Sequence, residues 1–184
     1  MEIIQTPIRG LLEIRPKVFP DSRGWFTELY KIDSFKTLEY PANFVQDNLS
    51  YSKKGVLRGL HLQLPPYQQA KLVTVITGSA LDVVVDLRQN SDTFGQSYKC
   101  LLDSRIHNML VIPEGFAHGF SALEDVTFFY KCSSVYNPQC ETGICWNDPD
   151  LNIDWEITDP ILSDKDASLP TLRELLRKSV ISRN

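Results

Sequence analysis

One short stretch decides the fold of this chain and carries its most unusual side chains: Gly55-Val56-Leu57-Arg58-Gly59-Leu60-His61-Leu62-Gln63. Its aliphatic residues, bounded by turn residues and the pair Pro65-Pro66, predict a β-strand. Strand side chains alternate between two faces, so the odd-numbered residues from 57 to 63 share one face and the even-numbered ones the other. The first face therefore places the polar side chains of His61 and Gln63 beside a glycine, which is unusual for a strand face that packs in a hydrophobic core. A buried, hydrogen-bonded histidine is the simple interpretation, and a functional histidine is the alternative.

On both sides of this stretch the chain repeats the same kind of pattern. Short apolar or alternating segments, separated by turn residues, lie at residues 11–16, 17–20, 25–30, 44–50, 70–76, 81–87, 97–102, 108–112, 117–123 and 126–132. Many short strands at near-regular spacing predict a sandwich or a barrel. The clearest helix signal is at the end of the chain, where Pro170 precedes an apolar stripe formed by Leu172, Leu175 and Leu176. A short helix through Leu38, capped by Asp33-Ser34, is a second candidate. No repeat or linker divides the chain, so we expect a single domain over residues 1–184.

The composition excludes several classes of function. The chain has 184 residues and a net charge of −4, which gives no basic footprint for nucleic acid. No apolar run approaches the roughly 20 residues that span a bilayer. The first residues lack the basic and apolar regions of a signal peptide, so we expect a cytoplasmic protein. The cysteines form no C-x-x-C pair, which favours free thiols in a reducing compartment: Cys100, Cys132, Cys140 and Cys145.

The chain has three histidines, of which two are candidates for a site. His107 lies in a segment that looks like a solvated turn, and we assign it no role. His118 has glycines close by on both sides, which let a ligand approach the backbone closely. Three histidines could bind a transition metal. The close spacing of a preformed metal site is missing, because the residue two after His61 is Gln63, so we expect no metal.

Eight segments, taken together and in order, resemble one enzyme family. They are DSRGWFTE (21–28), QDN (46–48), GVLRGLH (55–61), TFG (93–95), IPEGFAHGF (112–120), YK (130–131), WNDP (146–149) and SDKD (163–166). This order is similar to that of the dTDP-4-dehydrorhamnose 3,5-epimerases, over nearly the whole chain. The resemblance implies an all-β, cupin-type jelly-roll barrel with a short C-terminal helix. It also implies a homodimer that needs neither a metal nor an organic cofactor.

The chemistry of that family gives four residues a role. A ketone at C4 of a hexose acidifies the protons on C3 and C5, and epimerisation removes a proton from one face and returns one to the other. His61 resembles the base, and Asp166 resembles the carboxylate that orients the imidazole and stabilises its charged form. Tyr130 resembles the acid across the sugar ring, and Lys71 the cation beside the enolate oxygen. Each of these residues, taken singly, also has a structural interpretation: Tyr130 as a phenol that lines the barrel, Asp166 as a helix cap and Lys71 as a solvated charge.

The resemblance also implies a set of substrate-binding residues. Arginine suits the diphosphate because its planar fork pairs phosphate oxygens bidentately. The residues that resemble the family's contacts to phosphate, sugar and nucleoside are Arg23, Phe26, Glu28, Gln46, Asn48, Arg58, His118, Tyr136, Glu141 and Lys165. Strict alternation places Arg58 and His61 on opposite faces of one strand. Either a bulge or twist at Gly59 brings both to one site, or Arg58 reaches the ligand from the edge of the strand. Where the family often has two adjacent tyrosines this chain has Val135 and Tyr136, which weakens the expected contact with a thymine base.

Two classes of function stay open from the sequence. The first is an epimerase that inverts C3 and C5 of a nucleoside-diphosphate 4-keto-6-deoxyhexose, with an enzyme that acts at one carbon only, or a ketoisomerase, as its variants. The second is a cupin that only binds a sugar nucleotide. A pure binder has no reason to keep a base and an acid together, so the four catalytic candidates favour the enzyme.

Two structural expectations follow from the resemblance. We expect an antiparallel jelly roll with His61, Lys71, His118 and Tyr130 lining its interior. We also expect residues 21–30, which are aromatic-rich and extended, to pair with the sheet of a second copy of the chain and to add Arg23 and Glu28 to its site.

Overall fold

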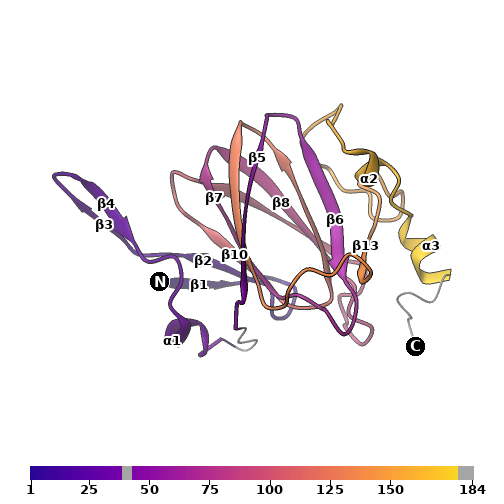
Figure 1. Ribbon diagram of the computed structural model, residues 1–184, viewed down its shortest axis with the longest axis horizontal. Coiled ribbons are helices and arrows are strands. Elements are labelled where there is room, and N and C mark those ends of the chain that lie inside the picture. Colours follow the sequence, from indigo (N-terminus) through magenta and orange to yellow (C-terminus); the bar gives the residue numbers. More distant parts are fainter. Residues whose placement is uncertain (39–42, 178–184) are drawn as a thin grey trace.

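The chain forms two antiparallel sheets that pack face to face (Figure 1), in a computed structural model that describes residues 1–38 and 43–177. The six-stranded sheet has the order β1 (Glu2–Gln5), β2 (Leu12–Arg15), β10 (Met109–Ile112), β7 (Lys71–Thr77), β12 (Val126–Cys132) and β5 (Gln46–Ser52). The five-stranded sheet has the order β13 (Glu141–Gly143), β6 (Leu57–Gln63), β11 (Phe116–Ala122), β8 (Ser79–Asp86) and β9 (Ser97–Asp103). This arrangement is the jelly roll expected from the sequence.

Side-chain alternation divides the apolar residues between two layers. Even-numbered residues of β8, such as Val84, join Val73, Leu110 and Phe128 in the core between the sheets. Odd-numbered residues of β8, such as Val83, face the other way. They are covered by the C-terminal segment, whose buried contacts include Trp155, Leu172 and Leu175. Because both faces of β8 are covered, all eight of its residues are buried, which explains why it has the strongest strand signal in the sequence.

Three short helices complete the described part of the chain: α1 (Ile32–Phe35), α2 (Asp164–Ala167) and α3 (Leu172–Arg177). The predicted C-terminal helix is α3, with Leu172 and Leu175 buried as its apolar stripe requires. It begins two residues after Pro170. The Thr171 hydroxyl accepts a hydrogen bond from Glu174 N, while the Glu174 carboxylate accepts one from Thr171 N, which is a capping box. Helix α2 and the short strands β1 and β13 were not predicted.

An N-terminal hairpin projects from the sandwich. It consists of β3 (Val18–Asp21) and β4 (Gly24–Thr27), which pair only with each other among the described residues. Figure 1 shows it extending away from both sheets. The predicted strand over residues 25–30 is therefore shorter than expected and ends at Thr27, so Glu28 lies just beyond it.

Strand β6 is irregular where it crosses β11. His61 lies opposite His118 and Arg58 lies opposite Phe120, so β6 uses three steps where β11 uses two. The extra residue falls at Gly59 and Leu60, which are joined by a cis peptide bond, and Gly59 has a φ of 112°. An added Cβ on Gly59 would lie 2.6 Å from Gly119 Cα, so only glycine fits this approach of β6 to β11.

Candidate active site

A cavity of about 270 Å³ opens between the two sheets. The four side chains expected in the interior all line it: His61 and His118 from the five-stranded sheet, Lys71 and Tyr130 from the six-stranded sheet. The complete lining is Ser50, Arg58, His61, Lys71, His118, Gly119, Phe120, Phe128, Tyr130, Ser163, Lys165 and Asp166. A molecule in this cavity therefore lies between a histidine wall and a wall that carries a lysine and a phenol.

His61 and Asp166 form a hydrogen-bonded pair at one wall. His61 Nε2 lies 2.6 Å from Asp166 Oδ1, and the Asp166 side chain is 6% exposed. The Ser163 hydroxyl, which caps α2, donates to Asp166 Oδ2 at 2.7 Å. Burial alone would raise the pKa of Asp166, but the hydrogen bonds from His61 and Ser163 outweigh it and hold this pKa below its ordinary value. Asp166 is therefore an anion that orients the His61 ring.

Lys71 and Tyr130 occupy the facing wall on the neighbouring strands β7 and β12. Burial lowers the pKa of the Lys71 ammonium, while nearby acidic groups, including Asp82 and Glu141, act in the opposite direction. Burial raises the pKa of Tyr130, so its phenol keeps its proton at neutral pH. No hydrogen-bond partner for the Tyr130 hydroxyl occurs among the described residues, and this proton donor is free to meet a ligand.

Arg58 reaches the same cavity as His61, because the extra residue in β6 shifts the alternation of side chains between them. The Arg58 guanidinium is fixed by the Ser52 hydroxyl, which accepts from Nε at 3.0 Å, and by the Tyr51 carbonyl, which accepts from Nη2 at 3.2 Å. A bulge in β6 at Gly59 and Leu60 therefore explains how Arg58 and His61 reach the same cavity.

Five of the expected binding residues form one chain of hydrogen bonds and an ion pair that ends at the cavity. Tyr136 N donates to Gln46 Oε1 at 2.9 Å, and the Tyr136 hydroxyl donates to Glu141 Oε2 at 2.6 Å. Lys165 Nζ, which lines the cavity, lies 2.6 Å from the same carboxylate oxygen. Asn48 shares the inward face of β5 with Gln46, whose amide donates to Asn48 Oδ1 at 2.9 Å.

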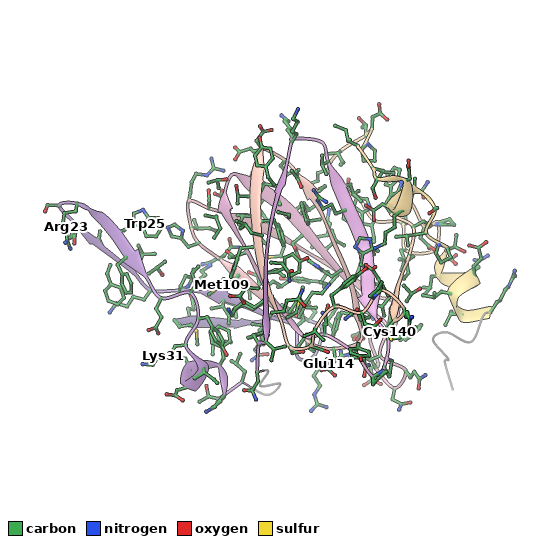
Figure 2. All side chains as sticks on the ribbon, in the orientation of Figure 1. Arg23, Trp25, Lys31, Met109, Glu114 and Cys140 are labelled. Atoms are coloured by element: carbon green, nitrogen blue, oxygen red, sulfur yellow. The ribbon has the colours of Figure 1, made fainter. Side chains whose placement is uncertain are left out.

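The structure does not bring the remaining expected residues to this cavity within one chain. Arg23 and Phe26 belong to the projecting hairpin, and Glu28 follows it. Figure 2 shows Arg23 at the tip of the hairpin, away from the sheets, while the Trp25 ring packs 4.1 Å from the ring of His107 in the loop between β9 and β10. Among the described residues, Arg23 pairs with Asp21 alone, at 2.6 Å.

Sequence reasoning missed several residues of the cavity. Ser50 continues the alternation of Gln46 and Asn48 and could have been found from it. Ser163 lies three residues before Asp166, which is the spacing of a helix cap. A third missed residue, Asp82 on β8, lies behind the lining residues, and its Oδ2 is 2.8 Å from Nε2 of His118, which lines the cavity. Its signal was a carboxylate in the most apolar strand of the chain.

A larger cavity, of about 740 Å³, lies elsewhere and shares no lining residue with the first. Loops around Arg88, Gln89 and Glu114 form much of its wall, and no histidine or tyrosine lines it. A proton-transfer site needs a base and an acid that face each other, so the smaller cavity is the candidate. In the described part of the chain, no three His, Cys, Asp or Glu side chains are grouped to hold a metal ion. None of the described helices has the length and apolar character needed to cross a membrane.

Comparison with known proteins identifies the family. The family model described as dTDP-4-dehydrorhamnose 3,5-epimerase matches residues 5–174. This chain belongs to the dTDP-4-dehydrorhamnose 3,5-epimerase family. An enzyme of that name from Escherichia coli K12 is 47% identical over 185 residues, which cover 99% of this chain and 100% of the relative. As a member of this family the chain is an isomerase that acts on a carbohydrate, and its fold is the cupin-type jelly roll of the family.

Two solved structures of family members extend the comparison. The epimerase from Legionella pneumophila, solved in complex with dTDP-4-keto-L-rhamnose, superimposes with a TM-score of 0.93 at 42% identity and covers 100% of this chain and 98% of its own. A 3'-monoepimerase from Streptomyces bikiniensis, in complex with dTDP-quinovose, superimposes with a TM-score of 0.89 at 35% identity, over 96% of this chain and 90% of its own.

Proposed function

We propose that this chain inverts C3 and C5 of a dTDP-linked 4-keto-6-deoxyhexose, with His61 as base and Tyr130 as acid. The observation that carries the proposal is the placement of His61 and Tyr130 on facing sheets of one cavity. A sugar ring held between the sheets would present one face to each residue. This is the arrangement that inversion requires, because the proton leaves from one face and returns to the other.

Each remaining group supports one step of this reaction. The anionic Asp166 stabilises the imidazolium that forms when His61 takes a proton from C3 or C5. The Lys71 ammonium, on the facing wall, stabilises the negative charge that develops on the C4 oxygen in the enolate. Tyr130 then gives its phenolic proton to the opposite face of the same carbon. Only bonds to hydrogen are broken and formed, so the reaction needs no redox partner. After each inversion His61 gives its extra proton to solvent, and the Tyr130 phenolate takes one up.

The size of the cavity supports a divided binding mode. A volume of about 270 Å³ is below the roughly 300–1,000 Å³ typical of sites for drug-sized ligands. The hexose occupies it, and the diphosphate and nucleoside extend past its edge toward Arg58, Lys165 and the Tyr136 side chain. Tyr136 is 49% exposed, which leaves its ring accessible to a base. The adjacent Val135, 53% exposed, offers no second ring there.

The hairpin supports assembly as a homodimer that exchanges it. Phe26, 65% exposed, and Phe19, 47% exposed, give the hairpin an apolar surface that its own chain leaves largely uncovered. Strand β5 is an edge of the six-stranded sheet, and Leu49 on its outward face is 66% exposed. An exposed hairpin and an exposed sheet edge are the two halves of a β-augmentation contact. In the dimer, Arg23, Phe26 and Glu28 would complete the site of the partner subunit.

The proposal takes residues 1–184 as one domain that works in the cytoplasm without a metal or organic cofactor. The four cysteines support a reducing compartment, because all of them are free thiols. Neither nucleic acid nor a membrane has a part in the proposed reaction.

One experiment tests the reaction and its extent. The protein is incubated with dTDP-4-keto-6-deoxyglucose in D₂O, and exchange and inversion at C3 and C5 are followed by NMR. Deuterium at both carbons, with inversion, is the expected result. The monoepimerase relative gives a specific runner-up, inversion at C3 alone, which the same spectra distinguish. Binding without exchange would overturn the catalytic proposal in favour of a sugar-nucleotide binder.

A further inference from the structure

Asp82 is a buried carboxylate in the wall behind the cavity. It lies on β8, opposite Phe120 of β11, and its side chain is 0% exposed. Its Oδ2 lies 2.8 Å from Nε2 of His118, which faces the cavity from β11. The other oxygen, Oδ1, is buried and has no hydrogen-bond partner among the described residues. A half-satisfied buried carboxylate is costly to keep in a core, so packing alone does not account for it.

A lysine and two histidines lie on the cavity side of this carboxylate. The charge of Asp82 acts on both Lys71 of the facing sheet and His118, and His61 lies directly opposite His118 in the strand register. Burial lowers the pKa of His118, and Lys71 and His61 add to this effect, while Asp82 opposes it. At neutral pH the His118 ring therefore carries one proton and not two.

The geometry points to Asp82 as a positioning residue that keeps this proton on His118 Nε2 and makes Nδ1 a hydrogen-bond acceptor for a sugar hydroxyl. The nitrogen that bears the proton in a neutral imidazole is set by the partner of the other nitrogen. A carboxylate accepts a hydrogen bond, so Nε2 donates to Asp82 and Nδ1 keeps its lone pair. Nδ1 has no hydrogen-bond partner in the described structure. This inference rests on the proposed function.

The chemical class of the ligand group follows from the lone pair. The enolate oxygen and the diphosphate offer only acceptors, which a bare nitrogen does not bind. Within the hexose, the hydroxyl groups are the donors. His118 and Lys71 therefore have complementary roles. Lys71 binds the C4 oxygen, which gains negative charge, and His118 accepts a hydrogen bond from a neutral hydroxyl and so fixes the orientation of the sugar ring. The free hydroxyls of this sugar are on C2 and C3, and only the C2 hydroxyl keeps its configuration when C3 is inverted. A contact between His118 and the C2 hydroxyl therefore affects substrate binding more than the chemical step.

The first test is made on the wild-type protein, needs a variant only for signal assignment, and does not depend on activity. Long-range ¹H–¹⁵N NMR of the wild-type protein at neutral pH resolves the ring nitrogens of only three histidines, and His118→Gln assigns the relevant signals. We expect the neutral form of His118 with its proton on Nε2. A proton on Nδ1, or a doubly protonated ring, overturns the inference even if the protein proves to be an active epimerase.

The second test replaces the carboxylate. In Asp82→Asn the amide can donate to Nε2, which moves the ring proton to Nδ1 and presents a donor to the hydroxyl. We expect the ¹⁵N signals of His118 to shift, and KM for the sugar nucleotide to rise on the order of 10-fold with a smaller change in kcat. Affinity for dTDP, which lacks the sugar, stays unchanged. Unaltered His118 signals in the folded variant overturn the inference.

Two controls separate positioning from general damage. Asp86→Asn removes another fully buried carboxylate from β8, one that pairs with Arg88 outside this cavity, and is expected to leave the His118 signals in place. In the double variant with His118→Gln, Asp82→Asn should raise KM no further, because Asp82 acts through His118. An additional rise would show that Asp82 has a structural role only. Wild-type protein without epimerase activity would refute the proposed function, while the NMR measurement would still decide the position of the proton.

Discussion

His61 Nε2 and Asp166 Oδ1 lie 2.6 Å apart although 105 positions separate the two residues in the chain. Asp166 is held in place by a second contact, from the Ser163 hydroxyl at the start of α2. With Nε2 engaged, Nδ1 of His61 has no hydrogen-bond partner among the described residues. A base whose other nitrogen is anchored to a fixed anion is oriented before the substrate arrives, which removes a reorganisation cost from proton transfer.

Loss of either member of this pair should stop the reaction to a similar extent. We expect His61→Ala and Asp166→Asn each to reduce hydrogen–deuterium exchange at C3 and C5 by about 10²–10⁴-fold, with nearly unchanged affinity for dTDP. The double variant should be little worse than either single one, because the two residues act as a unit. Exchange followed by NMR in D₂O gives the rates.

A matched histidine serves as the control for that series. His107 lies in a loop outside the cavity, where its ring packs 4.1 Å from the ring of Trp25 in the hairpin, and its φ of 55° is one that asparagine tolerates. Because His107 lines no part of the cavity, the chain with His107→Asn should exchange and invert the substrate at the wild-type rate. Additive losses in the double variant would show that Asp166 does not work through His61.

Replacement of the phenol separates proton removal from proton return. Tyr130→Phe keeps the ring and removes the proton donor on the wall that faces His61. We expect deuterium to enter C3 and C5 with retention, because His61 can return a proton to the same face, while inversion falls by about 10²–10⁴-fold. The measured quantity is the ratio of exchange to inversion. Tyr98→Phe, outside the cavity, should keep the wild-type ratio, and inversion by Tyr130→Phe at the wild-type rate would place the acid elsewhere.

Alternation explains which parts of the fold were predictable. Strands such as β12 were found with their bounds because one face is buried, and that leaves a period-2 pattern in the sequence. Helix α2 was missed because four residues give no helical period, and it is defined by its Ser163 cap and by contacts distant in sequence. The position of Arg58 could not be derived from alternation, since the period changes at Gly59 and a bulge is specified by the neighbouring strand.

Gly59 is expected to be indispensable for that bulge. Its φ of 112° disfavours any other residue, and a Cβ there would lie 2.6 Å from Gly119 Cα and 2.7 Å from the His118 carbonyl oxygen. We expect Gly59→Ala to lower the free energy of unfolding by more than about 3 kcal/mol. The strained φ and the clash with Gly119 and His118 both involve the backbone, which cannot move aside as a flexible side chain could. Urea unfolding measures the loss.

Gly95 provides the matched comparison for this variant. It also has a positive φ, 80°, but nothing lies within 4 Å of an added Cβ. Gly95→Ala should therefore lower the free energy of unfolding only by the cost of the positive φ, about 1 kcal/mol. Equal losses in the two variants would mean that crowding between β6 and β11 is unimportant.

Acid should destabilise the protein partly through Asp86. Burial would raise the pKa of Asp86, but hydrogen bonds from Arg88, Ser91 and Thr93 outweigh it and lower this pKa below the value of about 4 found in an unfolded chain. A lowered pKa in the folded state adds stability that is complete above about pH 4 and is lost as the pH falls through the folded value. Asp86→Asn should therefore unfold more easily at pH 7 and show a shallower loss of stability from pH 5 to pH 2. Urea midpoints across this range test it, and parallel curves for the two proteins would contradict the assignment.

If subunits of the proposed dimer exchange their hairpins, two inactive variants should regain activity when they are mixed. If Arg23 serves the partner's site, a mixed dimer of Arg23→Ala and His61→Ala contains one site with both residues intact and one site with neither. We expect each variant alone to be nearly inactive, and an equal mixture, after dissociation and reassembly, to regain about one quarter of wild-type activity, because half of the dimers are mixed and each has one good site. Light scattering should show a dimer at micromolar concentration. Asp166→Asn mixed with His61→Ala is the control, since both residues belong to the same chain's site and no mixed dimer contains an intact pair. Equal recovery in both mixtures, or none in the first, would show that the hairpin does not complete the site of a second subunit.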